Sequence, residues 1–199
     1  MYSISAMRQD EGEGPVKATE LLMEEHREIE RVINALERAI RRLARGEEVY
    51  LRFFTGTAVF IRGFVDGCHH KKEENVLFPA LIEHGLSDES GPVAVMLAEH
   101  EEGRRLATEI RQAVERLQGG DNRKRDVVVE KASDFIKLLR QHIYKEDHVL
   151  FPMADKLIPA SQQEELLLAF EPFANDESGE DLHEKYYGLA KRLENECMR

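Results

Sequence analysis

A chain of 199 residues, of which 42% are hydrophobic and 34% charged, has enough apolar side chains for one core, and this composition excludes a disordered protein. Its net charge of −11 excludes a general attraction to nucleic acid or to anionic membranes. Two cysteines are too few for a disulfide framework, and no apolar run has the length of a signal peptide core or a membrane span. We therefore expect a cytoplasmic globular protein.

Turn residues divide the chain into helices. Long stretches rich in Leu, Ala, Glu, Arg and Lys favour helix, and no run alternates apolar and polar residues as a half-buried strand would. Gly46, Pro79, Gly119 and Pro152 are predicted to mark helix ends. We expect long helices over residues 16–44, 47–77, 92–117 and 124–152, and shorter ones that end at Gly85, cover 162–170 and follow Gly179.

These elements predict an all-α fold with three parts. Residues 1–15 form a flexible N-terminal tail. Residues 16–158 form an antiparallel, up-down-up-down four-helix bundle, because short connections place successive helices side by side in opposite directions. Residues 159–199 form a short C-terminal helical extension that packs on one end of the bundle.

An internal repeat relates the two halves of the predicted bundle. The first helix carries an inward stripe with 4-3 spacing, which consists of Leu22, His26, Ile29, Ile33, Leu36, Ile40 and Leu43. A shift of 74 residues superposes it on Met96, His100, Gly103, Ala107, Ile110, Val114 and Leu117 of the third helix. The run from His69 to Pro79 matches the run from His142 to Pro152 at a shift of 73. The bundle is therefore predicted to consist of two related helical hairpins that face each other.

The repeat places histidine and glutamate on inward faces of all four helices. His69 and Glu73 are four residues apart, as are His142 and Glu146, so each pair lies on one helix face. Carboxylates are almost never buried unless their charge is compensated. A histidine on an apolar stripe is ordinarily a packed core residue, but four of them at matching registers with two glutamates indicate a metal centre. The predicted ligands are His26, His69, Glu73, His100, His142 and Glu146.

The pattern leaves the exact ligands and the metal open. His70 and Glu74 have the same spacing as His69 and Glu73 and form an alternative pair. Asp147 or Glu74 can also replace Glu146 or Glu73 as a ligand. Imidazole and carboxylate donors without sulfur favour iron first and then manganese or zinc. A carboxylate from each hairpin bridging two metals gives a centre of two ions.

The two His-x3-Glu runs that end in Leu-Phe-Pro, together with the Glu-His pairs at Glu25-His26 and Glu99-His100, resemble the hemerythrin-like (HHE cation-binding) family over about residues 16–158. The resemblance implies a non-haem di-iron centre, with the six residues above as ligands. Oxygen-storing members carry a further histidine four residues after the third-helix histidine, where Arg104 stands here. The set of four histidines and two glutamates is also similar to the di-iron domain of iron–sulfur cluster repair proteins.

The first functional hypothesis is a protein that binds O2 or NO, or peroxide, for storage, sensing or detoxification. The small residues Gly103 and Ala107 beside His100 leave room for such a ligand, or else allow close helix packing. The second hypothesis is a di-iron enzyme (oxidase, peroxidase or NO reductase) or an iron donor for cluster repair. The third is a metal-dependent structural or regulatory module. We expect a monomer or a homodimer, with no nucleic-acid or membrane partner.

Overall fold

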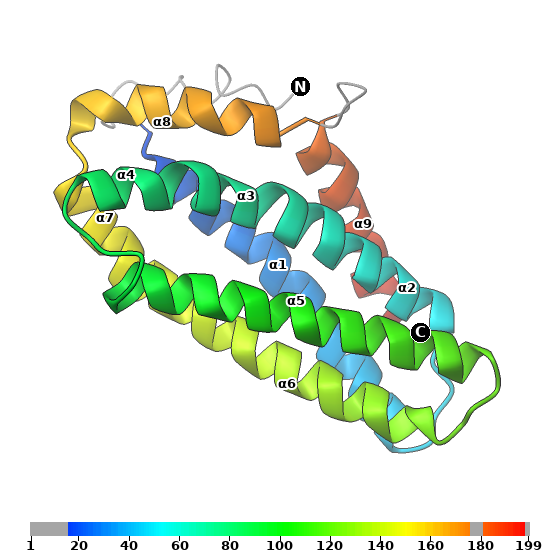
Figure 1. The fold of residues 1–199 in the computed structure, drawn as a ribbon. Coiled ribbons are helices and arrows are strands. Elements are labelled where there is room, and N and C mark those ends of the chain that lie inside the picture. Colours follow the sequence, from blue (N-terminus) through cyan, green and yellow to red (C-terminus); the bar gives the residue numbers. More distant parts are fainter. Residues whose placement is uncertain (1–15, 176–180, 198–199) are drawn as a thin grey trace.

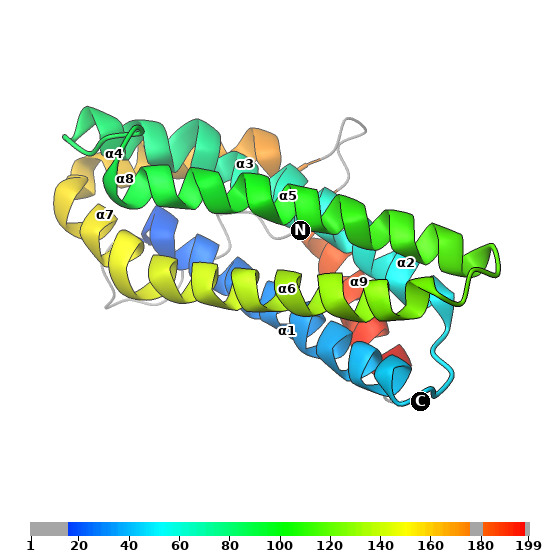
Figure 2. The same cartoon turned by 60° about the horizontal axis from the view of Figure 1, so that its bottom comes forward.

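Four helical rods lie side by side in the structure, which confirms the all-α prediction (Figures 1 and 2). The structure is a computed structural model and describes residues 16–175 and 181–197. Within these ranges the only extended pairing is a single bridge between Asn175 and Asp181. The predicted tail over residues 1–15 lies outside the described residues. No helix within the described ranges combines the length and the apolar character needed to cross a membrane.

Two of the rods are single α-helices, and two contain π-helical turns. The first rod is α1 (Ala18–Ala44) and the third is α5 (Gly91–Gln118). The second rod comprises α2 (Leu51–Phe60), a π-helical segment (Ile61–His69), α3 (His70–Lys72), a second π-helical segment (Glu73–Leu77) and α4 (Phe78–Glu83). The fourth rod comprises α6 (Lys124–Lys145), a π-helical segment (Glu146–Leu150) and α7 (Phe151–Leu157).

The second and fourth rods continue past their prolines, so the predicted helix ends at Pro79 and Pro152 are wrong. Each proline stands in the first turn of an α-helical segment, directly after a π-helical turn. Proline lacks an N–H and clashes with the carbonyl four residues earlier in a regular α-helix. A wider turn before the ring relaxes that clash, because its hydrogen bonds reach five residues back. The second rod also begins at Leu51 rather than at residue 47, because Tyr50 is extended.

Two apolar clusters fill the bundle, with a polar layer between them. On α1, Leu22 belongs to the cluster at one end and Ile29 to the larger cluster at the other end, and His26 lies between the two. The predicted inward stripe of α1 is buried along its whole length. The histidines and glutamates of the repeat therefore occupy a layer enclosed by hydrocarbon above and below.

The C-terminal segments pack on two different parts of the bundle. A short 3-10 turn (Ala160–Gln162) precedes α8 (Gln163–Phe170), which joins the smaller cluster at one end of the bundle. A second 3-10 turn (Glu171–Phe173) follows α8. In contrast, α9 (Leu182–Cys197) lies along α1 and the second rod and contributes to the larger cluster. A Cβ on Gly63 would stand 1.7 Å from the Tyr186 hydroxyl, so this glycine allows α9 to approach.

Candidate metal centre

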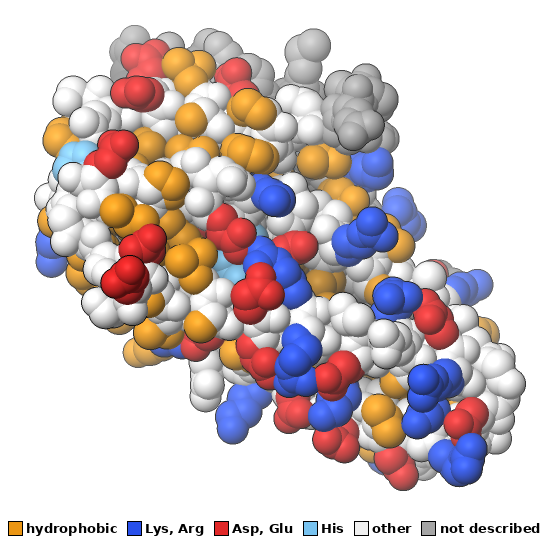
Figure 3. Space-filling model, in the orientation of Figure 1, with side chains coloured by type: hydrophobic (Ala, Val, Ile, Leu, Met, Phe, Trp, Pro, Cys, Tyr) orange, Lys and Arg blue, Asp and Glu red, His pale blue; other side chains and the backbone are white. Residues whose placement is uncertain are grey.

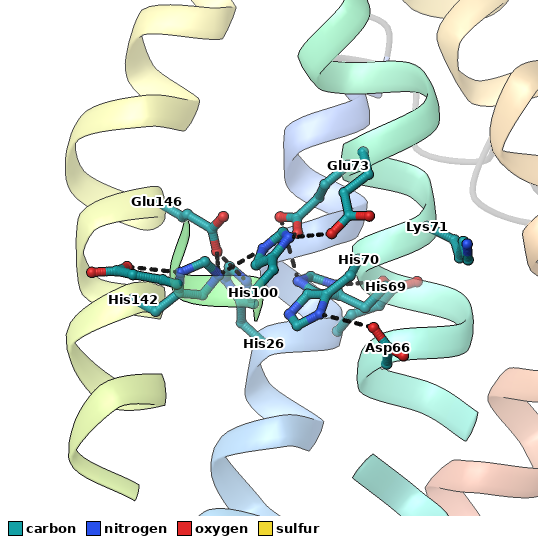
Figure 4. A network of polar contacts seen from close by, with 12 residues as sticks. His26, Asp66, His69, His70, Lys71, Glu73, His100, His142 and Glu146 are labelled. Carbon is teal, nitrogen blue, oxygen red and sulfur yellow. Dashed lines mark hydrogen bonds and ion pairs between the residues drawn. The ribbon is translucent and has the colours of Figure 1, made fainter. Parts of the chain in front are cut away.

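The structure brings all six predicted ligands together and adds His70. The donor atoms of one group, which consists of His26, His69, Glu73 and Glu146, all lie within 4.8 Å of one another. The same limit holds for a second group, which consists of His70, Glu73, His100 and His142. Glu73 belongs to both groups, so its carboxylate lies between two places where a cation can bind. Figure 4 shows these side chains converging in the interior of the bundle.

His70 reaches the centre because the helix that carries it is not a regular α-helix. In a regular helix His69 and Glu73 share one face and His70 lies 100° away from it. The segment Ile61–His69 is π-helical, and its turns contain more residues, so two successive histidines face the bundle interior. His70 stacks on His100, with ring centroids 3.8 Å apart. Glu74, its predicted partner, is in neither group.

The donor atoms of the centre are buried, and most of them lack hydrogen-bond partners. The exceptions are the Nε2 atoms of His100 and His142, which lie 3.1 Å apart. Glu73 and Glu146 are fully buried, and His70, the most exposed member of the centre, is only 5% exposed. All buried side-chain N and O atoms without a partner, among the described residues, belong to His26, His69, His70, Glu73 and Glu146. Buried polar atoms are nearly always hydrogen-bonded, so such a cluster is costly as it stands. One cation in each group would contact the imidazole and carboxylate atoms that face the interior, so the residues fit a metal centre.

Each histidine on the repeat is held by a carboxylate at its outer nitrogen. The Nδ1 atom lies 2.8 Å from Glu25 in His69 and 3.0 Å from Glu99 in His142. The corresponding distances are 2.7 Å from His26 to Asp147 and 2.7 Å from His100 to Glu74. These contacts fix the ring so that Nε2 points into the centre, as in metal sites where a carboxylate orients the ligating imidazole.

These contacts also show where the two alternative carboxylates lie. Asp147 and Glu74 hold the outer nitrogens of His26 and His100, so neither faces the centre. The inward carboxylates are Glu73 and Glu146.

A cationic side chain stands behind each orienting carboxylate. Lys72 contacts Glu25, and Lys145 contacts Glu99. Arg27 contacts Asp147, and Arg104 contacts Glu74. The two lysine–glutamate contacts are related by the internal repeat. Glu25 and Glu99 are 74 residues apart, and Lys72 and Lys145 are 73 apart. These cations keep the carboxylates ionised and acting as acceptors. The two halves of the molecule thus repeat the orienting carboxylates and the lysines behind two of them, whereas the two arginines do not correspond in the repeat.

Sequence reasoning did not identify the lysines or His183 as parts of the centre. Lys72 is 1% exposed, which is unusual for a lysine, and His183 of α9 places Nε2 2.7 Å from Glu25. The repeat contained a signal for the lysines, because both follow a ligand histidine by three residues. No comparable signal existed for His183, which lies outside the repeat.

The two inward carboxylates differ in their affinity for protons. Burial raises the pKa of Glu146, and the nearby Glu73 carboxylate raises it further, well above its usual value. Burial opposes the ionisation of Glu73, but His69 and His100 outweigh it and hold its pKa well below the usual value. Burial likewise disfavours protonation of His100, yet its contacts with Glu73 and Glu74 raise its pKa to about 9. Without a cation, protons therefore supply the positive charge that the carboxylates require.

A cavity of about 250 Å³ adjoins the second ligand group. Gly103 and Ala107 line it, so the small residues leave space rather than a tight helix contact. A Cβ on Gly103 would meet only the Leu138 side chain, at 3.9 Å. Arg104 also lines the cavity, and its guanidinium is bound to Asp66 and Glu74.

Comparison with known proteins agrees with this centre. The hemerythrin HHE cation-binding domain matches residues 17–154. Uncharacterized proteins of Mycobacterium tuberculosis and Mycobacterium bovis are 29% identical over 171 residues, which cover 85% of this chain and 66% of theirs. The iron-sulfur cluster repair protein YtfE of Yersinia pestis is 39% identical over 90 residues, which cover 43% of this chain and 40% of that protein. The chain thus spans less than two thirds of these relatives, and no solved structure matches it.

Proposed function

Because the chain belongs to the hemerythrin HHE cation-binding domain family, we propose that it holds two iron ions in the buried centre and binds O2 or NO there, for storage, sensing or detoxification. The observation that carries this proposal is the set of buried imidazole and carboxylate atoms without hydrogen-bond partners. A cation accepts the lone pairs of imidazole nitrogens and carboxylate oxygens together, and it also neutralises the buried carboxylate charge, which a water molecule would not do.

The donor set supports iron over other metals. Each group offers imidazole and carboxylate donors, with Glu73 common to both. Neither group contains sulfur, which disfavours a structural zinc site. For a two-ion centre, imidazole and carboxylate donors favour iron first, then manganese, then zinc. Cys68 lies next to His69 in sequence but belongs to a different cluster with Glu25 and His183.

Two iron ions, when bound, supply open coordination positions and the electrons that O2 or NO binding requires. The chain itself supplies the surroundings. Hydrocarbon on both sides of the polar layer keeps bulk water out, so the ions are retained. The carboxylates at the outer nitrogens hold the imidazoles in place without a metal, so little reorganisation accompanies loading. The apolar cavity beside His100 gives a small neutral molecule a route inward.

The test is anaerobic loading with iron(II), followed by metal analysis and visible spectroscopy. We expect two iron ions per chain, and an absorption band that appears with O2 or NO and disappears when the gas is removed under vacuum. Glu73→Gln should reduce the bound iron below one ion per chain, because this carboxylate serves both groups. Glu165→Gln, an exposed position on α8, is the matched control and should bind iron as the wild type does. A wild-type protein that retains no iron would refute the proposal.

A second candidate is a di-iron enzyme or an iron donor for cluster repair. The similarity over 90 residues to a protein named for iron-sulfur cluster repair favours it. The same loaded protein separates the two functions. Steady consumption of O2, NO or peroxide with an added reductant indicates an enzyme, and transfer of iron to an apo cluster protein indicates a donor. Reversible gas binding without either activity supports the first function.

A further inference from the structure

The cavity beside the centre is mostly apolar and is too large for a diatomic gas. It lies between the second rod, α5 and α6, and its walls are formed largely by Ile61, Val65, Ala107, Phe135, Leu138 and Leu139. One water needs only about 10–15 Å³ of such space, and an apolar cavity of about 150 Å³ already holds a benzene-sized guest. The observed volume of about 250 Å³ therefore suits an organic molecule.

The cavity is elongated along the bundle. Its lining residues on α5 extend from Glu99 to Arg111, and those on the second rod extend from Ala58 to His70. Twelve residues of α-helix rise about 18 Å. His70, His100 and His142 line one end, next to the candidate metal position. A long narrow space with hydrocarbon walls fits an alkyl chain better than a compact ring.

Positive charge lines the outer half of the cavity. Two contacts between α5 and the antiparallel second rod show how far along the bundle each residue lies from the metal centre. Arg104 contacts Asp66 close to the centre, and Gln118 contacts Thr55 far from it. Arg62 and Arg111 fall between these levels, and both are exposed at the surface. Figure 3 shows Lys and Arg side chains alternating with acidic ones over this half of the molecule.

The arginines of the cavity differ in how far they are neutralised. Arg104 already contacts Asp66, Glu74 and Glu101. Arg62, in contrast, has no ion pair or hydrogen bond with any residue that the structure describes, and Arg111 has one exposed partner. Asp66, four residues after Arg62 on the same wall, accepts a hydrogen bond from Arg104. The outer half thus offers cationic groups to an anionic head group.

We propose that this cavity binds a medium-chain fatty acid, with its carboxylate at Arg62 and Arg111 and its alkyl chain directed along α5 toward His70 and His100. The alkyl chain would occupy the cavity that the proposed function gives to O2 or NO as a route inward, but its binding does not depend on the gas chemistry. It needs no iron, so it can fail or succeed independently of the proposed metal chemistry.

The experiment is calorimetric titration of the full chain, metal-free and loaded with zinc, with decanoate below its micelle concentration. We expect saturable binding of one decanoate per chain. Butyrate should bind at least about a hundredfold more weakly, because each buried methylene contributes about 0.8 kcal/mol. Absence of saturable decanoate binding in both forms would overturn the proposal.

Substitutions that fill the cavity test whether the alkyl chain of decanoate lies in it. Ala107→Leu and Gly103→Leu each place a large side chain in the space, and each should weaken decanoate binding at least about tenfold. Gln112→Leu adds the same side chain to α5 outside the cavity and should leave binding unchanged. Circular dichroism confirms that each variant is folded. Unchanged affinity in both filled variants, if folded, would place the ligand elsewhere and refute the assignment.

The charge of the head group is tested separately. Arg62→Gln should weaken decanoate binding about threefold, as expected for one exposed ion pair, and should not change the binding of decan-1-ol. Arg116→Gln removes a charge from an exposed position of α5 outside the cavity and is the control. If decanoate and decan-1-ol lose affinity equally in the Arg62 variant, the arginine does not recognise a carboxylate and the proposal is wrong.

Discussion

Replacing Glu146 by glutamine should stabilise the metal-free protein while it weakens metal binding. A carboxylate oxygen of Glu146 lies within 4.8 Å of one of Glu73, and both residues are fully buried. Two unit charges at that distance repel by about 3.5 kcal/mol at an effective dielectric constant of about 20. Protonated His100 offsets part of this energy, and Glu146 avoids the rest by taking up a proton, because burial and Glu73 raise its pKa. The net gain expected from the substitution is therefore about 1–2 kcal/mol.

The assay is urea unfolding of metal-free wild type and Glu146→Gln at pH 7, followed by the same measurement after zinc loading. The variant should have the higher free energy of unfolding without metal and the lower one with metal, because metal binding adds stability only to the folded state. Glu165→Gln, which is exposed, should change neither value by more than about 0.5 kcal/mol. If Glu146→Gln destabilises the metal-free chain as well, this carboxylate has a structural role and the reasoning fails.

Three further predictions concern the pH, the orienting carboxylates and the C-terminal helix. The pKa of His100 is raised to about 9, from 6.5, and Glu146 also holds a proton without metal, so a metal must displace both protons at neutral pH. Zinc affinity should therefore rise by at least about tenfold per pH unit from about 7 to 9, and a flat profile would contradict this. Glu99→Gln should reduce zinc affinity about 10–100-fold by releasing the outer nitrogen of His142, and unchanged affinity in competition titrations would exclude that role. Gly63→Ala should displace Tyr186 and cost about 1–3 kcal/mol in thermal unfolding, whereas an unchanged melting temperature would show that α9 is loosely held.

The sequence repeat predicted the buried layer of histidines and glutamates, because the inward face of a regular helix follows from residue spacing alone. His26 and His100 lie on straight α-helices, where the 4-3 pattern locates the inward face directly. The predicted pairing of His142 with Glu146 is also present in the structure, where Nε2 lies 3.2 Å from the carboxylate. These features required no knowledge of how the helices pack.

His70 could not be assigned from spacing, because local helix geometry overrides the regular period. The π-helical turns of the second rod change the direction of successive side chains, and no residue pattern in the sequence marks them in advance. The helix end predicted at Pro79 is wrong for the same reason. A regular α-helix would stop at this proline, but the π-helical turn before it accommodates the ring, so the rod continues. The contact of His183 with Glu25 depends on how α9 docks, which is a tertiary event.

The most direct test of the two-ion centre is a crystal structure of the iron-loaded chain with anomalous scattering measured at the iron edge. We expect two anomalous peaks, both in contact with Glu73, one also beside His26 and His69 and the other beside His100 and His142. A single peak, peaks elsewhere in the molecule, or imidazoles turned away from the interior would contradict the account.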